Sequence, residues 1–96
     1  MPIGATRIET DIKSTTNLEK YLDTIGRNVA GFHNDSLGYD DVYHIGYSTV
    51  LMTSYHGLKL QIEVVGRYHK TLAQKIAKWI KRHEKPTVLD LHHERG

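Results

Sequence analysis

Apolar residues recur at spacings of three and four between residues 16 and 32, where the positions between them are mostly polar. The stripe consists of Leu18, Tyr21, Leu22, Ile25, Val29 and Phe32. This spacing predicts an amphipathic helix over 16–32. Thr16, with Glu19 three residues later, fits a capping box in which hydroxyl and carboxylate satisfy the first free N–H groups. Glycine at 31 and the polar run that follows predict a loop after this helix.

A second helical stripe begins at Thr71 and consists of Leu72, Ile76, Trp79 and Ile80. Thr71 and Gln74 fit another capping box, and Pro86 provides a stop signal. The sequence therefore predicts a helix over 71–85. At about 100° per residue, the lysine and arginine side chains of this segment fall on the side opposite the apolar stripe.

Between the two predicted helices, apolar and polar residues alternate along 43–51 and again along 58–68. His56-Gly57 separates the two runs, with glycine where a two-residue hairpin turn needs a positive φ. If Tyr55 pairs with Leu58, then Leu51 lies opposite Ile62. In that register the apolar members of both runs share one face, as a half-buried hairpin requires. The set consists of Tyr43, Ile45, Tyr47, Thr49, Leu51, Leu58, Leu60, Ile62, Val64 and Tyr68.

Weaker strand patterns occur over 5–12 and 87–94. The resulting order β-α-β-β-α-β predicts an α+β fold, a ferredoxin-like sandwich with two helices on one face of a four-stranded antiparallel sheet. If the first strand does not form, an α-β-β-α-β variant remains. We expect one compact α+β domain over 1–96, with residues 1–4 and 93–96 frayed.

Composition narrows the class of protein. Of 96 residues, 39% are hydrophobic and 25% charged, which is typical of a globular chain. The absence of cysteine excludes disulfides, thiolate nucleophiles and cysteine-based zinc sites. No apolar run is long enough to span a membrane, and the N-terminus lacks the pattern of a signal peptide. We therefore expect a cytoplasmic protein without a cofactor.

The formal net charge of +2 hides an uneven distribution. Residues 1–66 carry 5 Lys/Arg and 8 Asp/Glu, a net of −3, whereas 67–85 carry 7 Lys/Arg and a single glutamate, a net of +6. Such a basic segment predicts contact with an anionic partner, most plausibly the backbone of nucleic acid. The first hypothesis is thus a non-enzymatic binding module. Its contact residues are Arg67, Lys70, Lys75, Lys78, Lys81, Arg82 and Lys85.

Two alternatives use other parts of this surface. The start of the second helix, at 66–71, offers free N–H groups beside Arg67 and Lys70 that suit any anion. In the predicted register, Val50, Met52 and Val65 form an apolar patch on the open sheet face. This face or an edge strand is where we expect a second copy, as in a homodimer, or another protein to dock. That reading describes a protein-interaction module, such as a small inhibitor or adaptor, with viral modulators of host proteins as one such class. An acidic protein surface would then meet the basic helix.

A third hypothesis is an enzyme. The predicted register places His44 opposite His69, near the loop that carries Asp40 and Asp41. Two imidazoles and a carboxylate suit zinc or another transition metal, and such an ion activates water against a phosphodiester. The spacing matches no known metal signature, and the plainer reading is a pair of solvated histidines at the end of a strand ladder. We assign no catalytic residue from the sequence.

Overall fold

The computed structural model describes residues 4–29, 41–55 and 59–94. Along these segments the elements follow the order β1 (Ala5–Thr10), α1 (Thr16–Ile25), β2 (Arg27–Asn28), β3 (Asp41–Ile45), β4 (Ser48–Tyr55), β5 (Lys59–Gly66), α2 (His69–His83) and β6 (Leu89–Glu94). All strand pairs are antiparallel. The α+β class with two helices and an antiparallel sheet is therefore confirmed for this part of the chain.

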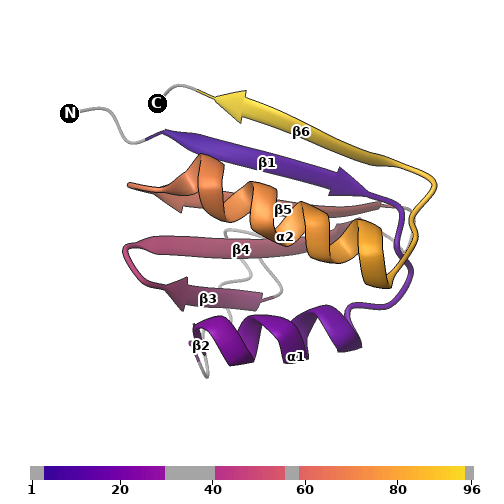
Figure 1. Ribbon diagram of the computed structural model, residues 1–96, viewed down its shortest axis with the longest axis horizontal. Coiled ribbons are helices and arrows are strands. Elements are labelled where there is room, and N and C mark those ends of the chain that lie inside the picture. The colour runs from indigo at the N-terminus through magenta and orange to yellow at the C-terminus, as the bar shows by residue number, and fades with distance from the viewer. Residues whose placement is uncertain (1–3, 30–40, 56–58, 95–96) are drawn as a thin grey trace.

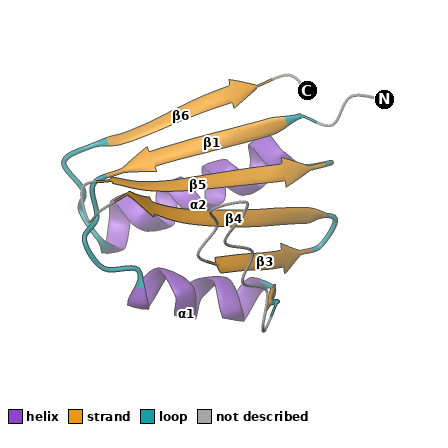
Figure 2. Cartoon of the chain, turned by 180° about the vertical axis from the view of Figure 1, so that it is seen from behind, coloured by secondary structure: helices purple, strands orange, loops and turns teal. Residues whose placement is uncertain are grey.

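The sheet has the order β2-β3-β4-β5-β1-β6. Helix α2 crosses in front of β1 and β5, whereas α1 runs along the β3 side of the sheet (Figure 1). Seen from behind, the strands are in front of α2 (Figure 2). The described strands number six, not the four of the ferredoxin-like sandwich that we predicted. The two additional strands, β2 and β3, extend the sheet beside β4.

Between the sheet and the helices lies a core of buried apolar side chains. Its members are Ile8, Leu18, Leu22, Tyr43, Val50, Met52, Leu60, Ile62, Val64, Leu72, Ala73, Ile76, Ala77 and Ile80. The stripes predicted for both helices contribute to this core. Each fully buried Leu, Ile, Val or Met side chain stabilises the fold by about 1.5–3 kcal/mol relative to exposure.

The hairpin differs most from the prediction because a tight turn at Gly46-Tyr47 divides its first run into β3 and β4. Ile45 pairs with Ser48 across this turn. Gly46 has φ +60°, at the position where a type II′ turn takes glycine. At the other end of β4, Tyr55 pairs with Lys59 rather than with Leu58, so β4 is shifted by one residue relative to β5 and Met52, rather than Leu51, lies opposite Ile62.

A one-residue shift exchanges the two faces of a strand. Val50 and Met52, which we expected on the open face, are buried in the core. Tyr47 and Tyr68, which we expected in the core, are 80% and 56% exposed. Of the three tyrosines in the predicted set, only Tyr43, which precedes the turn, keeps its predicted place in the core, whereas Leu60, Ile62 and Val64 of β5 are all buried as predicted.

Helix α1 ends at Ile25, seven residues before the predicted end. The N–H of Gly26 donates to the carbonyl of Leu22 at 2.9 Å, and β2 then pairs with β3. A Cβ at Gly26 would lie 2.6 Å from the backbone oxygen of His44, so glycine allows this close approach. The last position of the predicted stripe, Phe32, lies outside the described residues.

Helix α2 begins at His69, two residues before the predicted start, and its N-cap Tyr68 makes no side-chain cap. The helix ends at His83, and the chain turns through Lys85, whose φ is +46°. Asp11 holds this connection, because its Oδ1 accepts hydrogen bonds from the N–H groups of Thr87 and Val88, each at 3.0 Å. The bond from Val88 lowers the pKa of Asp11.

Strand β6 continues through Glu94, although we expected fraying from residue 93. Among the described residues, no helix has the length and apolar character needed to cross a membrane.

Candidate nucleic-acid interface

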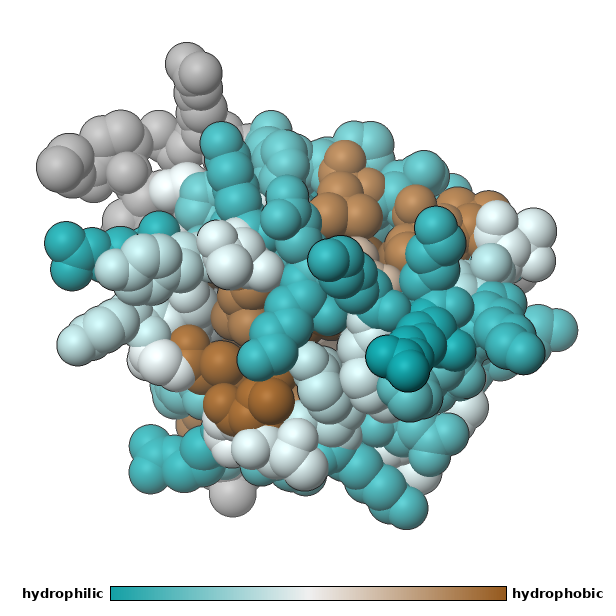
Figure 3. All heavy atoms as spheres, in the orientation of Figure 1, coloured by the Kyte–Doolittle hydropathy of each residue, from teal (hydrophilic) through white to brown (hydrophobic). Residues whose placement is uncertain are grey.

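Helix α2 and the residues flanking it present a band of positive charge. The side of α2 that carries Leu72, Ile76 and Ile80 is buried against the sheet. All seven cations predicted for the interface are exposed. We call them the basic band, which consists of Arg67, Lys70, Lys75, Lys78, Lys81, Arg82 and Lys85. In the space-filling view, hydrophilic side chains crowd over α2, and hydrophobic patches appear on both sides of them (Figure 3).

The charges of the basic band lack acidic partners within the described segments. An ion pair within these segments joins Arg7 to Glu9 at 3.2 Å, on strand β1. No ion pair within 4–29, 41–55 and 59–94 involves a residue of the basic band. The positive charge of α2 is therefore available to an external anion.

The predicted pairing of His44 with His69 is wrong, because the two residues belong to different kinds of element. His44 lies in β3, opposite Thr49, whereas His69 is the first residue of α2. Asp40 lies outside the described residues. Among those that the structure describes, no three histidine, aspartate or glutamate side chains come together in a way that suits a metal ion.

His69 instead joins a hydrogen-bonded group with the buried hydroxyl of Thr6. The Oγ1 of Thr6 lies 2.8 Å from the Nδ1 of His69 and 2.8 Å from the Nδ1 of His93. A hydroxyl donates only once, so one imidazole accepts from Thr6 and the other donates its Nδ1–H to the oxygen. Burial, reinforced by the charge of Lys70, lowers the pKa of His69. This histidine anchors the start of α2 to β1.

The open face of the sheet offers no apolar patch of the predicted kind, because Val50 and Met52 are in the core. On the central strands that face carries polar side chains such as Glu63 together with Leu51 and Val65. Arg7 lies opposite Glu63 on one side and His92 on the other. The structural basis for a protein interface on Val50, Met52 and Val65 is therefore lost.

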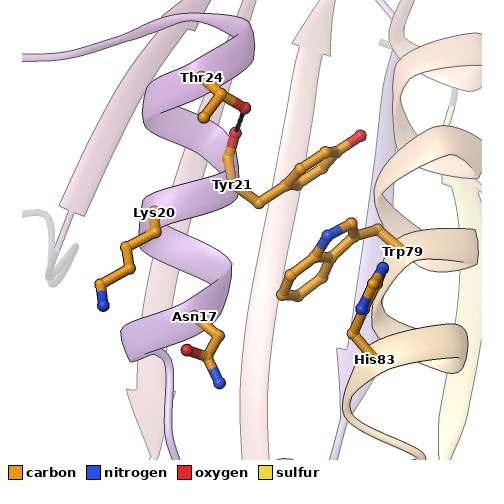
Figure 4. Close-up of a pocket in the computed structure, with 6 residues that line it drawn as sticks. All are labelled: Asn17, Lys20, Tyr21, Thr24, Trp79 and His83. Carbon is orange, nitrogen blue, oxygen red and sulfur yellow. Dashed lines mark hydrogen bonds between the residues drawn. The ribbon is translucent and has the colours of Figure 1, made fainter.

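A groove between α1 and α2 borders the basic band near the C-terminal end of α2. Three rings form a stack along it: Tyr21 lies 4.9 Å from Trp79 with an interplanar angle of 12°, and Trp79 lies 4.9 Å from His83 at 29° (Figure 4). The groove has a volume of about 420 Å³. Its lining consists of Asn17, Lys20, Tyr21, Thr24, Trp79 and His83.

The sequence did not reveal this groove. Tyr21 and Trp79 both fall on apolar stripes, and the periodicity placed them in the core. Both are only partly buried, and His83 is exposed. The available signal was the spacing of Trp79 and His83, since residues four apart on a helix are neighbours.

Two smaller grooves also border α2. One, of about 370 Å³, lies near its start and includes Tyr47, Tyr68 and Lys75. The other, of about 230 Å³, separates α2 from β6 and places Lys78 and Lys81 beside leucine side chains of the strand. The basic band therefore has aromatic surface on one side and aliphatic surface on the other.

A pair of carboxyl groups joins α1 to β3. A hydrogen bond with Asp41, together with burial and the charge of Asp41, raises the pKa of Glu19 to about 7. Asp41 also accepts a hydrogen bond from the side-chain amide of Asn28 at 3.3 Å. Asp41, which we had considered as a metal ligand, thus takes part in a contact between α1, β2 and β3.

Comparisons with known protein families, with curated proteins and with solved structures found no match to this chain.

Proposed function

We propose that this protein binds the phosphate backbone of nucleic acid through the basic band. The observation that carries the proposal is the row of exposed cations on α2, none of which has an acidic partner among the described residues. Lysine predominates in the row, and lysine contacts fix the position of a backbone rather than read its sequence. Binding of this kind is sensitive to salt and tolerant of sequence.

The length of α2 fits a short stretch of one nucleic-acid strand. From Lys70 to Arg82 the helix rises about 18 Å, at 1.5 Å per residue. Phosphates follow one another every 3.4 Å along the axis of a duplex strand, so this length spans about five of them. The number of phosphates is thus comparable to the number of cations on the outer side of the helix.

The first test is charge reversal, measured by the fluorescence anisotropy of a labelled oligonucleotide. The variant Lys78→Glu/Arg82→Glu changes the net charge by −4 within the basic band. The control, Lys13→Glu/Lys59→Glu, makes the same change at exposed positions outside it. We expect the first variant to lose at least tenfold in affinity, with a much smaller loss in the control. Equal losses would mean that net charge alone attracts the oligonucleotide, and the assignment of the basic band would be wrong.

An acidic protein surface is the competing partner for the same cations. Competition with polyglutamate of matched charge distinguishes a nucleic-acid partner from an acidic protein partner. We expect an unlabelled oligonucleotide to displace the labelled one at a much lower concentration than polyglutamate does. Equal potency would contradict a nucleic-acid function and favour a protein partner.

A further inference from the structure

We infer that the groove between α1 and α2 receives an unpaired base, so that the preferred ligand is single-stranded nucleic acid. This inference rests on the proposed function, because it names the kind of nucleic acid that the basic band holds. It starts from the rings of Tyr21, Trp79 and His83, which lie stacked along the groove beside the basic band (Figure 4).

The stack has the chemistry of a platform for bases. Trp79 is the middle ring, and the exposed His83 forms the outer end. A base added to such rings gains about 1–3 kcal/mol from stacking, whatever its identity, because every base has a π-face. The groove also offers the amide of Asn17, which both donates and accepts hydrogen bonds at the edge of a base.

The cations lie where the phosphates of such a strand would run. Lys75 and Arg82 precede and follow Trp79 by four and three residues, so on a helix they are its neighbours. Lys20 lines the opposite, α1 side of the groove. A base in the groove would therefore have positive charge on both sides, as an electrostatic channel for a single strand requires.

The groove near the start of α2 extends this path. Tyr47 and Tyr68 lie there with large exposed ring surfaces, and Lys75 lines the same groove. Thr71 lines this groove and Trp79 the first, and the helix rises about 12 Å between them. At a stacked spacing of 3.4 Å, about three or four nucleotides cover that distance. Two aromatic surfaces along one helix thus suit a continuous short strand.

A duplex cannot use these rings without losing base pairs. The bases of a duplex are paired and stacked on one another. A base must therefore leave the duplex before it can enter the groove. The basic band holds the phosphates of either form. Only an unpaired strand can add a base to the exposed His83 end of the stack, and this difference predicts a preference for single strands.

The test uses three labelled probes of the same length: a single strand, a duplex and an abasic strand that keeps the phosphates but lacks the bases. Trp79 is the only tryptophan in the chain, so its fluorescence reports directly on the groove. The variant His83→Ala removes the exposed end of the stack. Its control, His92→Ala, removes an exposed histidine from β6 on the other face of the sheet.

We expect the single strand to bind at least fivefold more tightly than the abasic strand and the duplex, and to quench Trp79. His83→Ala should lower the single-strand affinity about fivefold or more, since a stacked base contributes 1–3 kcal/mol, and should leave abasic binding unchanged. His92→Ala should change neither. Equal affinity for all three probes, or unchanged Trp79 emission at saturation, would overturn the inference while the proposed function stands. If no probe binds at low salt, the proposed function itself fails.

Discussion

Two threonines on β1 provide a sharp test of the fold, because they share a face and a depth but differ in their hydrogen bonds. Thr6 and Thr10 are both fully buried. The hydroxyl of Thr6 bonds to His69 and His93, each at 2.8 Å. The hydroxyl of Thr10 has no hydrogen-bond partner among the described residues. Replacing each by valine keeps the volume nearly constant and removes only the hydroxyl.

The two substitutions should change the free energy of unfolding in opposite directions. In Thr6→Val, two hydrogen bonds of about 1 kcal/mol each are lost, and the additional buried methyl group returns about 0.8 kcal/mol. The expected net loss is about 1 kcal/mol. In Thr10→Val, the removal of an unpaired buried hydroxyl, which costs about 1–3 kcal/mol, and the gain of the methyl group should together stabilise the fold by about 1–2 kcal/mol.

Thermal unfolding followed by circular dichroism measures this difference. For a domain of this size, 1 kcal/mol corresponds to about 4–8 °C in Tm, so the two variants should differ by roughly 10 °C or more. A Thr10→Val variant that is less stable than the unmodified protein would refute the claim that its hydroxyl is unpaired. A Thr6→Val variant with the same Tm as the unmodified protein would show that the hydrogen bonds to the two histidines do not stabilise the fold.

Three further predictions concern particular positions. The folded state binds the proton of Glu19 more tightly than the unfolded chain does, because the pKa of this residue rises from 4.5 to about 7. Stability should therefore fall as the pH rises from about 4.5 to 7, and Glu19→Gln should remove this fall in Tm and stabilise the protein at pH 8 by about 1–2 kcal/mol after allowance for solvent screening. Gly66 has φ +129°, and a Cβ there would lie 2.6 Å from the backbone oxygen of Tyr47. Gly66→Ala should therefore lower the free energy of unfolding, measured by urea denaturation, by more than about 2 kcal/mol. Gly46→Ala, at φ +60° with no atom within 4 Å of its Cβ, should cost only about 1 kcal/mol, and equal costs would contradict the close contact at Gly66. Lys85→Gly should raise Tm by a few degrees, because glycine adopts the φ of +46° without strain; a lower Tm would contradict this.

Much of the fold was predictable from periodicity. The stripe of Leu72, Ile76 and Ile80 identified the buried side of α2, and with it the exposed side that carries the basic band. Both helices and the strands of the predicted β-α-β-β-α-β order are present. The helices were predictable because each has an apolar stripe that admits one buried side, whereas the patterns of β1 and β6 were weaker.

The errors arose where a short turn interrupted such a pattern. Tyr43, Ile45, Tyr47 and Leu51 fall on alternate positions that continue across Gly46, so this spacing does not mark the turn, although Val50 and Met52 also offered an apolar set for the opposite face. The glycine itself was a signal, but an ambiguous one, because a single glycine within a strand pattern is compatible with a bulge as well as a turn. This one turn reversed the faces of β4 and removed the proposed histidine pair.

The aromatic groove depends on contacts between two helices that the sequence does not relate to each other. Tyr21 and Trp79 are 58 positions apart, and only the packing of α1 beside α2 brings their rings into contact. Apolar periodicity predicts that each faces inward but not how far it is covered. Partial exposure at the boundary between two helices therefore has to be read from the structure.

The salt dependence of binding tests the central claim most directly, namely that the basic band holds nucleic-acid phosphates. The affinity for a labelled single strand should fall steeply between about 50 and 200 mM salt. In a plot of log K against log salt concentration, each phosphate contact contributes about −0.7 to the slope. The neutral variant Lys78→Gln/Arg82→Gln, which loses two of these contacts, should show a slope shallower by about 1.4. A matched Lys13→Gln/Lys59→Gln variant should keep the slope of the unmodified protein. Identical slopes for all three proteins, or no binding at low salt, would contradict the assignment of the basic band.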